Sequence, residues 1–153
     1  MMKIIYTRSD GGLSVIHPVV NTGETLTPEE AVVRAMKDVP VDATNVQLVA
    51  ASTIPTDRTF RDAWKADTGA VVVDMPKARA LHLDRIRVAR QPLLVKLDAD
   101  WMKALGQKKT GEADAIEAQR QTLRDLPATV KVAEATTPED LKQLWPASLA
   151  RED

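Results

Sequence analysis

The chain has 153 residues, a formal net charge of −1 and no cysteine. A chain of this length most often forms one domain, and its nearly balanced charge gives no overall field that would attract nucleic acid or an acidic membrane. The lack of cysteine excludes disulfides and thiolate metal sites. No apolar run is long enough for a transmembrane helix, and charged residues come too early for a signal peptide. We therefore expect a cytosolic protein that does not contact membranes.

The first residues predict a β-hairpin. Two β-rich runs, residues 3–7 and 13–17, stand on either side of a Ser-Asp-Gly-Gly turn at 9–12. Aspartate and glycine tolerate the positive φ angles that tight turns require. A loop is expected to follow at residues 21–23.

A helix and a third strand are expected next. Thr27, Pro28 and Glu30 have the spacing of a capping box with proline at the first helical position, so a helix is predicted from there to about residue 38. An apolar run at 46–50 has the length of a strand and is expected to pair beside the hairpin. The order β-β-α-β predicts a small sheet with one helix packed on one face.

Residues 58–66 predict a short helix that carries two aromatic side chains. Phe60 and Trp64 are four residues apart and would share one face of it. Two interpretations follow: the pair docks the small sheet onto the helices further along the chain, or it binds a partner. We favour the docking interpretation. Residues 70–73 then form either a short edge strand or an extended lead into the next helix.

Residues 74–126 predict two antiparallel helices joined by a short polar link, and the rest of the chain is organised around them. The first helix is expected to begin at the cap Asp74 and to end at Gly106, with a kink or a break near Pro92. The second is expected to end before Pro127. The predicted apolar face of the first helix follows gaps of three and four residues: Leu83, Ile86, Leu93 or Leu94, Leu97, Trp101 and Leu105.

The opposite face of the first helix is expected to be basic, and contact with phosphates is one interpretation of it. Acidic residues occur nearby in both helices, so we favour a solvated face with ion pairs inside the hairpin and expect no nucleic-acid partner. Aromatic residues, which would stack on bases, make up only 3% of the chain. The basic residues of this face are Arg79, Arg85, Arg87, Arg90, Lys96 and Lys103.

The fold class predicted from these elements is α+β, with a small α/β unit at 1–73 and a helical hairpin with a short C-terminal helix at 74–153. The sequence leaves open whether the two parts share one core. Thr137 is the expected cap of the C-terminal helix, and the residues from Ser148 on are expected to be frayed.

No residue pattern predicts catalysis, and we expect a protein that is not an enzyme and holds no cofactor or metal. His17 and His82 stand on different predicted elements, with no further histidine or cysteine close by in the sequence. A half-buried polar role is therefore favoured for both over metal binding. The serines lack the neighbours that activate a nucleophile, and no glycine-rich phosphate loop is present.

Residues 120–127 read Arg-Gln-Thr-Leu-Arg-Asp-Leu-Pro. This segment resembles the Arg-Gln-Ala-Leu-Arg-Asp-Ile-Pro signature of bacteriophage tail assembly chaperones, which closes a helical segment that begins with spaced arginines. The resemblance covers about residues 85–127. Just before the signature, Ile116 and Gln119 stand where the family usually has Trp and Tyr. The resemblance implies a helper in the folding, trimerisation or attachment of a tail fibre, with no catalytic residues to carry over.

The resemblance also implies a protein–protein role for the helical hairpin. The expected partner is a phage tail fibre or baseplate protein, bound in the host cytoplasm during assembly. Association with a second copy and retention in the virion tail stay open. The alternative is a small phage-encoded inhibitor or regulator that binds a host protein or nucleic acid. The residues expected to contact a partner are Phe60, Trp64, Arg87, Arg90, Trp101, Arg120 and Arg124.

Asp125 lies in the last turn of the second predicted helix, where the helix dipole disfavours an acid. It is therefore expected to pair with an arginine, for example Arg87 or Arg90 of the first helix. Such a pair would fix the register of the hairpin.

Overall fold

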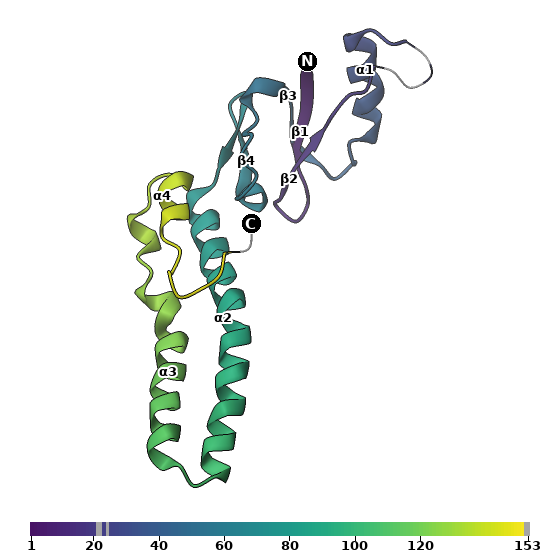
Figure 1. Cartoon of the computed structure of the whole chain (residues 1–153). Helices are drawn as coiled ribbons and strands as arrows, with labels where there is room; N and C mark the ends of the chain where they lie inside the picture. Colours follow the sequence, from purple (N-terminus) through teal and green to yellow (C-terminus); the bar gives the residue numbers. More distant parts are fainter. Residues whose placement is uncertain (21–22, 24, 152–153) are drawn as a thin grey trace. The chain divides into compact units, whose positions relative to one another are not determined.

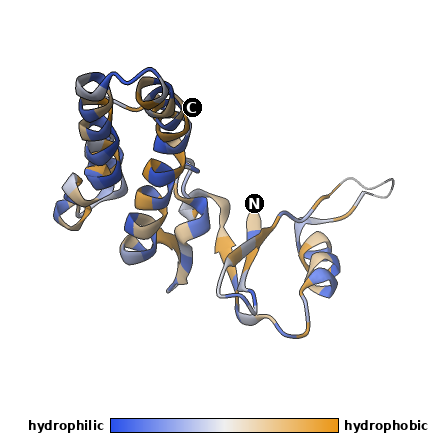
Figure 2. Cartoon of the chain, turned by 90° about the horizontal axis from the view of Figure 1, so that it is seen from below, coloured by the Kyte–Doolittle hydropathy of each residue, from blue (hydrophilic) through white to orange (hydrophobic). Residues whose placement is uncertain are grey.

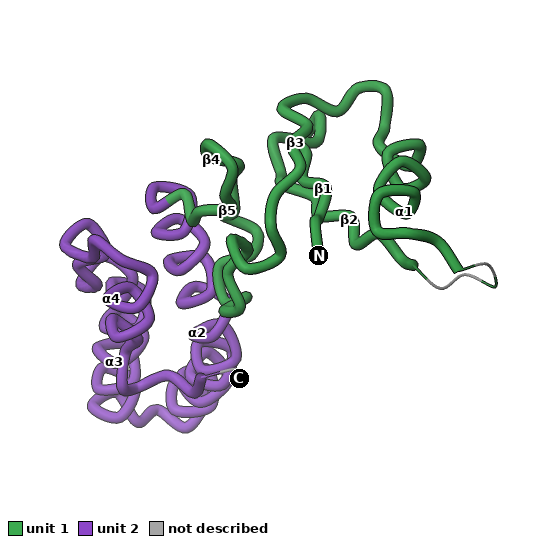
Figure 3. Tube along the Cα trace, turned by 90° about the horizontal axis from the view of Figure 1, so that it is seen from above, with its two compact units in different colours: residues 1–74 green, residues 75–153 purple. Residues whose placement is uncertain are grey.

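The computed structural model describes residues 1–20, 23 and 25–151. It contains two compact units, residues 1–74 and 75–153, shown in green and purple in Figure 3. The first unit (unit 1) holds an antiparallel sheet with one helix. The second (unit 2) holds a helical hairpin followed by a short helix (Figure 1), so the predicted α+β class is confirmed. The loop predicted at 21–23 falls largely outside the described residues.

The sheet of unit 1 has three antiparallel strands, β1 (Met2–Thr7), β2 (Leu13–Ile16) and β3 (Thr44–Ala50), in the order β2-β1-β3. The predicted hairpin is confirmed as β1 and β2. Its turn places Gly11 at a φ of +77°, in the left-handed region that glycine adopts without strain. The predicted third strand is confirmed as β3, which pairs with β1 and forms an edge of the sheet.

Both faces of the central strand are covered, since Ile4, Ile5 and Tyr6 are all buried. Successive side chains of a strand point to opposite faces, so Ile5 faces one side while Ile4 and Tyr6 face the other. The helix of unit 1 contacts β1, and a second β-hairpin supplies the remaining cover. The core on the Ile5 side consists of Ile5, Val49, Trp64 and Val71.

The second β-hairpin corrects the helix predicted at 58–66. A short 3₁₀ turn over Arg61–Ala63 leads directly into β4 (Trp64–Asp67), which pairs antiparallel with β5 (Ala70–Val73). The tight reversal at Gly69, whose φ is +70°, allows the two strands to pair. Alternation within β4 places Trp64 in the core, and this burial outweighs the helical spacing of the two aromatic residues. The edge-strand interpretation of residues 70–73 is thereby confirmed.

Helix α1 (Pro28–Ala35) begins with the predicted capping box. The Thr27 hydroxyl accepts a hydrogen bond from the Glu30 N–H at 3.2 Å, and the Glu30 carboxylate accepts one from the Thr27 N–H at 2.9 Å. A 3₁₀ turn over Met36–Asp38 continues the helix to the predicted end. Ala31 and Ala35 are buried, which allows α1 to lie close to the sheet.

Unit 2 is dominated by α2 (Met75–Gly106) and α3 (Thr110–Thr129), which form the predicted antiparallel hairpin. Of the kink or break expected near Pro92, the break is wrong, because α2 is one continuous helix. Pro92 is exposed, so its ring meets no neighbouring element, and the carbonyl of Val88, which loses its helix donor, can be hydrated. The expected end of the second helix before Pro127 is also wrong, since α3 continues to Thr129.

The chain ends in α4 (Pro138–Gln143), which has the predicted capping box between Thr137 and Asp140. The described residues that follow, up to Arg151, are not frayed as expected. Leu149 is buried, and its carbonyl accepts a hydrogen bond from Trp145 Nε1 at 3.1 Å. Arg151 donates a hydrogen bond to the carbonyl of Lys142 at 2.6 Å, so the chain folds back onto α4 up to the last described residue.

Candidate protein-binding surfaces

Arg90 links the two helices of the hairpin. Its Nη1 donates a hydrogen bond of 2.8 Å to the carbonyl of Leu123 and another to the carbonyl of Arg124. In a regular helix the N–H of residue 127 would donate to the Leu123 carbonyl, but Pro127 has no N–H. Arg90 therefore supplies the donor that Pro127 lacks, which explains why α3 passes through this proline.

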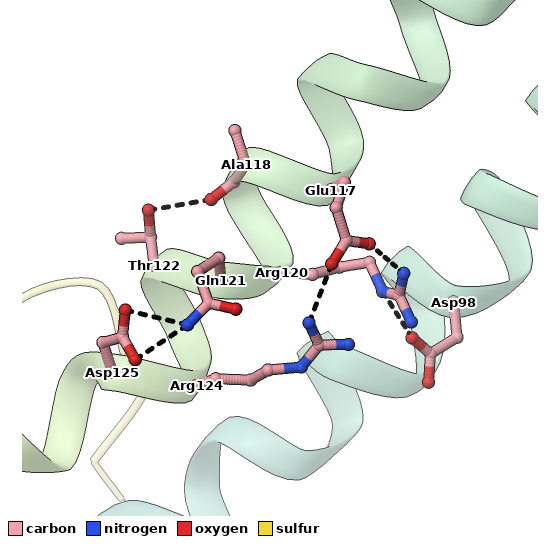
Figure 4. A network of polar contacts seen from close by, with 8 residues as sticks. All are labelled: Asp98, Glu117, Ala118, Arg120, Gln121, Thr122, Arg124 and Asp125. Carbon is pink, nitrogen blue, oxygen red and sulfur yellow. Dashed lines mark hydrogen bonds and ion pairs between the residues drawn. The ribbon is translucent and has the colours of Figure 1, made fainter.

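Arg120 forms a second link between the helices. Its guanidinium lies 4.8 Å from the centre of the Trp101 ring, and its Nε is 2.7 Å from Asp98 of α2. It also pairs with Glu117, one turn earlier on α3 (Figure 4). With its side chain only 13% exposed, Arg120 is held by three partners inside the hairpin.

Glu117 is shared by two arginines. Arg124 Nη1 donates to one of its oxygens at 2.8 Å, while Arg120 contacts the other (Figure 4). The hydrogen bond from Arg124, joined by the charges of both guanidinium groups, holds the pKa of Glu117 below its usual value. The acid therefore stays ionised and keeps the arginines ordered.

The predicted pairing of Asp125 is wrong. Asp125 accepts two hydrogen bonds from Gln121 of its own helix, at 2.9 and 3.0 Å (Figure 4). Arg87 pairs instead with Asp84 at 2.5 Å, and Arg90 contacts backbone carbonyls. An arginine can satisfy two carbonyls of α3 at once, which an acid on the same helix cannot do. The inter-helix contact expected of Asp125 is thus made by Arg90.

The structure separates the residues expected to contact a partner. Phe60 and Trp64 are 2% and 3% exposed, and Trp64 belongs to the core of unit 1. Arg90, Trp101 and Arg120 are joined in the hairpin. The described residues that keep substantial exposure from this set are Arg87 and Arg124, each of which already has an acidic partner.

The outer side of α2, where a basic face was predicted, carries an apolar line. Its members are exposed and follow one another at gaps of four and three residues. Such spacing keeps them within one narrow stripe of the helix, on the side away from the buried Ile86 and Ala104. We call this stripe the outer line: Val88, Pro92, Val95, Ala99, Met102 and Gly106.

Charged residues of opposite sign flank the outer line. Lys96 and Lys103 lie along one side of it, and Asp84 and Asp98 along the other. The sequence could have revealed the line through its regular spacing. It was missed because neighbouring arginines suggested that the whole face was basic, whereas Arg90 points into the hairpin.

Unit 1 contains a second apolar surface, a groove of about 310 Å³ between α1 and the sheet. Leu48 of the edge strand β3 forms one side of it, and Val32 and Val33 of α1 form the other. Leu48 pairs across the sheet with Ile4, so it belongs to the face on which α1 lies. The groove is lined by Met1, Met2, Pro18, Val20, Pro28, Glu29, Ala31, Val32, Val33 and Leu48.

No local pattern in the sequence predicts this groove, because its walls come from separate segments. Several of its apolar side chains are exposed, among them Met1, Val33 and Leu48. The short α1 covers only part of the sheet face, so the β3 side of that face stays open. Contiguous apolar surface of this kind is typical of a site that binds another molecule.

His82 is a buried polar residue of unit 2. It is 4% exposed and lies edge-on to Trp145, with ring centres 5.6 Å apart. Its Nε2 is 3.5 Å from the carbonyl of Leu144. Burial lowers the pKa of His82, partly offset by that carbonyl, and the charges of Arg85 and Arg151 lower it further. The neutral ring therefore serves as a packing element beneath the chain end.

Among the described residues, no three or more histidine, aspartate or glutamate side chains converge as a metal site would require. Within the same residues, none of the helices combines the length and apolar character needed to cross a membrane.

Comparisons with known proteins gave no match to a family model, to a curated protein or to a solved structure.

Proposed function

We propose that the protein is a bacteriophage tail accessory protein that assists the assembly or attachment of a tail fibre by binding another polypeptide. The tail assignment rests on the resemblance of residues 120–127 to the tail assembly chaperone signature. The binding role rests on one observation in particular, the apolar groove beside the edge strand of unit 1.

The groove suits an apolar segment of a partner chain. Leu48 lies on β3, whose outer edge is not paired with another strand of the sheet. An extended segment placed there can bond to the strand edge while its side chains enter the groove. In this proposal the fibre polypeptide has such segments exposed before it trimerises, and a helper with this groove would cover them during assembly.

The arginines of the hairpin support the protein partner over a nucleic acid. Arg90 and Arg120 bind carbonyl and carboxylate oxygens inside the hairpin, and Arg124 pairs with Glu117. A guanidinium held in this way is not available to neutralise a phosphate. In this proposal the tail polypeptide binds the groove of unit 1 and not the arginines of the hairpin.

The test is co-expression with the tail-fibre and baseplate polypeptides of the phage or prophage genome that encodes the chain. We expect one of them to co-purify. We also expect Val33→Asp and Leu48→Asp to reduce the captured amount at least tenfold, because each puts a charge into the apolar groove. Val41→Asp is the matched control, since Val41 is fully exposed in the same unit and does not line the groove.

Three outcomes would count against the proposal. Capture of no tail polypeptide would oppose the whole assignment. If Val33→Asp, Leu48→Asp and Val41→Asp all reduce the captured amount equally, the groove is not the binding site. A salt-sensitive shift of DNA or RNA by the purified chain would favour the phage-encoded regulator instead. Detection of the chain in purified particles distinguishes a retained tail component from a transient helper.

A further inference from the structure

We propose that two copies of this chain associate side by side, with their α2 helices parallel, through the outer line. The gaps of four and three residues from Val88 to Met102 average 3.5 residues. This is the repeat that lets two helices keep one stripe in contact along their length. The association is a property of unit 2 and is separate from the groove of unit 1.

The outer line is free for such a contact within unit 2. Helix α3 lies against the other side of α2, where Ile86 and Ala104 are buried and Arg90 reaches the α3 carbonyls. All members of the outer line are exposed, including the large side chains of Val88, Val95 and Met102. A second α2 can therefore approach without displacing α3.

The flanking charges select a second copy and a parallel orientation. In parallel two-stranded packing, a residue on one flank meets the residue five positions later on the opposite flank of its partner. This rule places Asp98 opposite the other copy's Lys103, and Gln91 opposite its Lys96. An antiparallel arrangement would bring lysine to lysine and aspartate to aspartate, which is unfavourable.

The groups required for these contacts are accessible. The Asp98 side chain is 54% exposed although one of its oxygens bonds to Arg120, so the carboxylate can accept a further donor. Lys96 and Lys103 are exposed and have no ion-pair partner among the described residues. A parallel second copy provides an acid for Lys103 and an amide oxygen for Lys96.

The size of the contact sets its strength. The outer line is about 27 Å long at about 1.5 Å per residue, and the small residues Ala99 and Gly106 allow the helices to approach closely. At Pro92 the Val88 carbonyl needs water or a donor, so the closest contact is expected from Val95 to Met102. This contact is smaller than a standard interface of about 1,600 Å², so association on the order of micromolar is expected.

The first experiment measures the mass of the full chain by sedimentation over a wide concentration range. We expect a monomer–dimer equilibrium, with Val95→Asp weakening the dimer at least tenfold and Lys103→Glu weakening it several-fold. Val41→Asp adds the same charge on the exposed surface of unit 1 and should leave the equilibrium unchanged. Circular dichroism of Val95→Asp should retain the wild-type helical signal, which shows that the hairpin still folds.

The second experiment tests whether the two α2 helices are parallel. Because the sequence has no cysteine, an introduced cysteine is the only thiol that can form a disulfide. In a parallel dimer the two copies of position 102 face each other, so Met102→Cys should form an intermolecular disulfide under a mild oxidant such as air. Val41→Cys should not. A wild-type chain that stays monomeric at all concentrations would overturn the proposal. Failure of Met102→Cys to cross-link in a dimer, or a dimer that Val95→Asp leaves intact, would overturn it equally.

Discussion

Unit 1 buries large side chains between its layers, whereas the hairpin of unit 2 is built largely from alanines and arginines. The fully buried side chains of unit 1 include Ile4, Ile5 and Phe60. Those along the hairpin include Ala104 and Ala113, with arginines bridging from helix to helix. Figure 2 shows the same difference, because the strands of unit 1 are largely hydrophobic while the long helices alternate between hydrophobic and hydrophilic residues.

This difference predicts which substitutions should destabilise each unit most. A sheet packed by large apolar groups loses most when volume is removed, because a cavity remains. A hairpin closed mainly by small residues has little volume to lose except at Ile86, and it depends more on polar groups that are costly to leave unpaired. The two units should therefore respond in opposite ways to truncation of apolar side chains and to removal of hydrogen-bond donors.

The largest effect is expected at Trp64 in the core of unit 1. Trp64→Ala should lower the free energy of unfolding by about 3–5 kcal/mol, the usual cost of deleting a buried aromatic side chain. The indole N–H is buried without a hydrogen-bond partner among the described residues, so Trp64→Phe should cost much less. Denaturant unfolding followed by circular dichroism measures both. Equal losses for the two variants would contradict this expectation.

The next effect is expected at Arg90 in unit 2. Arg90→Ala leaves the Leu123 carbonyl without a donor and should cost about 1–3 kcal/mol in unfolding free energy. In a Pro127→Ala background the same change should cost less, because alanine at 127 restores the helix N–H. A double-mutant cycle measures this coupling.

Asp125→Ala is the matched comparison for Arg90, because Asp125 is exposed and bonds to a residue of its own helix. It should change the unfolding free energy by no more than about 0.5 kcal/mol. If Asp125→Ala costs as much as Arg90→Ala, the hairpin is fixed by a contact other than the one between Arg90 and the α3 carbonyls.

The smallest effect is a pH dependence from His82. Its pKa is lowered by burial, so below about 6.5 the unfolded chain binds a proton that the folded chain does not. Stability is therefore highest above that pH and declines as the pH falls toward the lowered pKa. His82→Phe, which keeps an aromatic ring beside Trp145, should flatten the curve between about pH 5 and 7.

His17 gives the control for this measurement, since burial and then the charge of Lys3 also lower its pKa. In a His17→Asn variant the remaining slope should come mainly from His82. If the slope of stability against pH persists in His82→Phe and disappears in His17→Asn, the pH dependence comes from unit 1 instead.

Local chemistry in the sequence predicted the elements whose signals lie within a few residues. The capping boxes at Thr27 and Thr137 and the turn at Gly11 were recognisable because their partners are three or fewer positions away. The helix predicted around Phe60 and Trp64 is wrong. Two residues four positions apart share one face in a helix and in a strand alike, so their spacing does not distinguish the two structures. Only pairing with β5 decides between a helix and a strand there.

The sequence could not predict features that depend on distant segments. The helix end predicted before Pro127 is wrong because the donor that replaces the missing N–H comes from Arg90 of the other helix. The pairing of Asp125 failed for the same reason, since nothing nearby shows that Arg90 is already engaged. The groove of unit 1 brings Leu48 next to Val33, and no spacing rule connects those positions.

Because Arg90 finishes the last turns of α3, that helix is not self-sufficient. Cut out as a free peptide, residues 110–129 would have an unravelled end, since no guanidinium would reach its orphaned carbonyls. The two helices must therefore fold together. Pro127 would normally end a helix, and here it makes the folding of α3 dependent on α2.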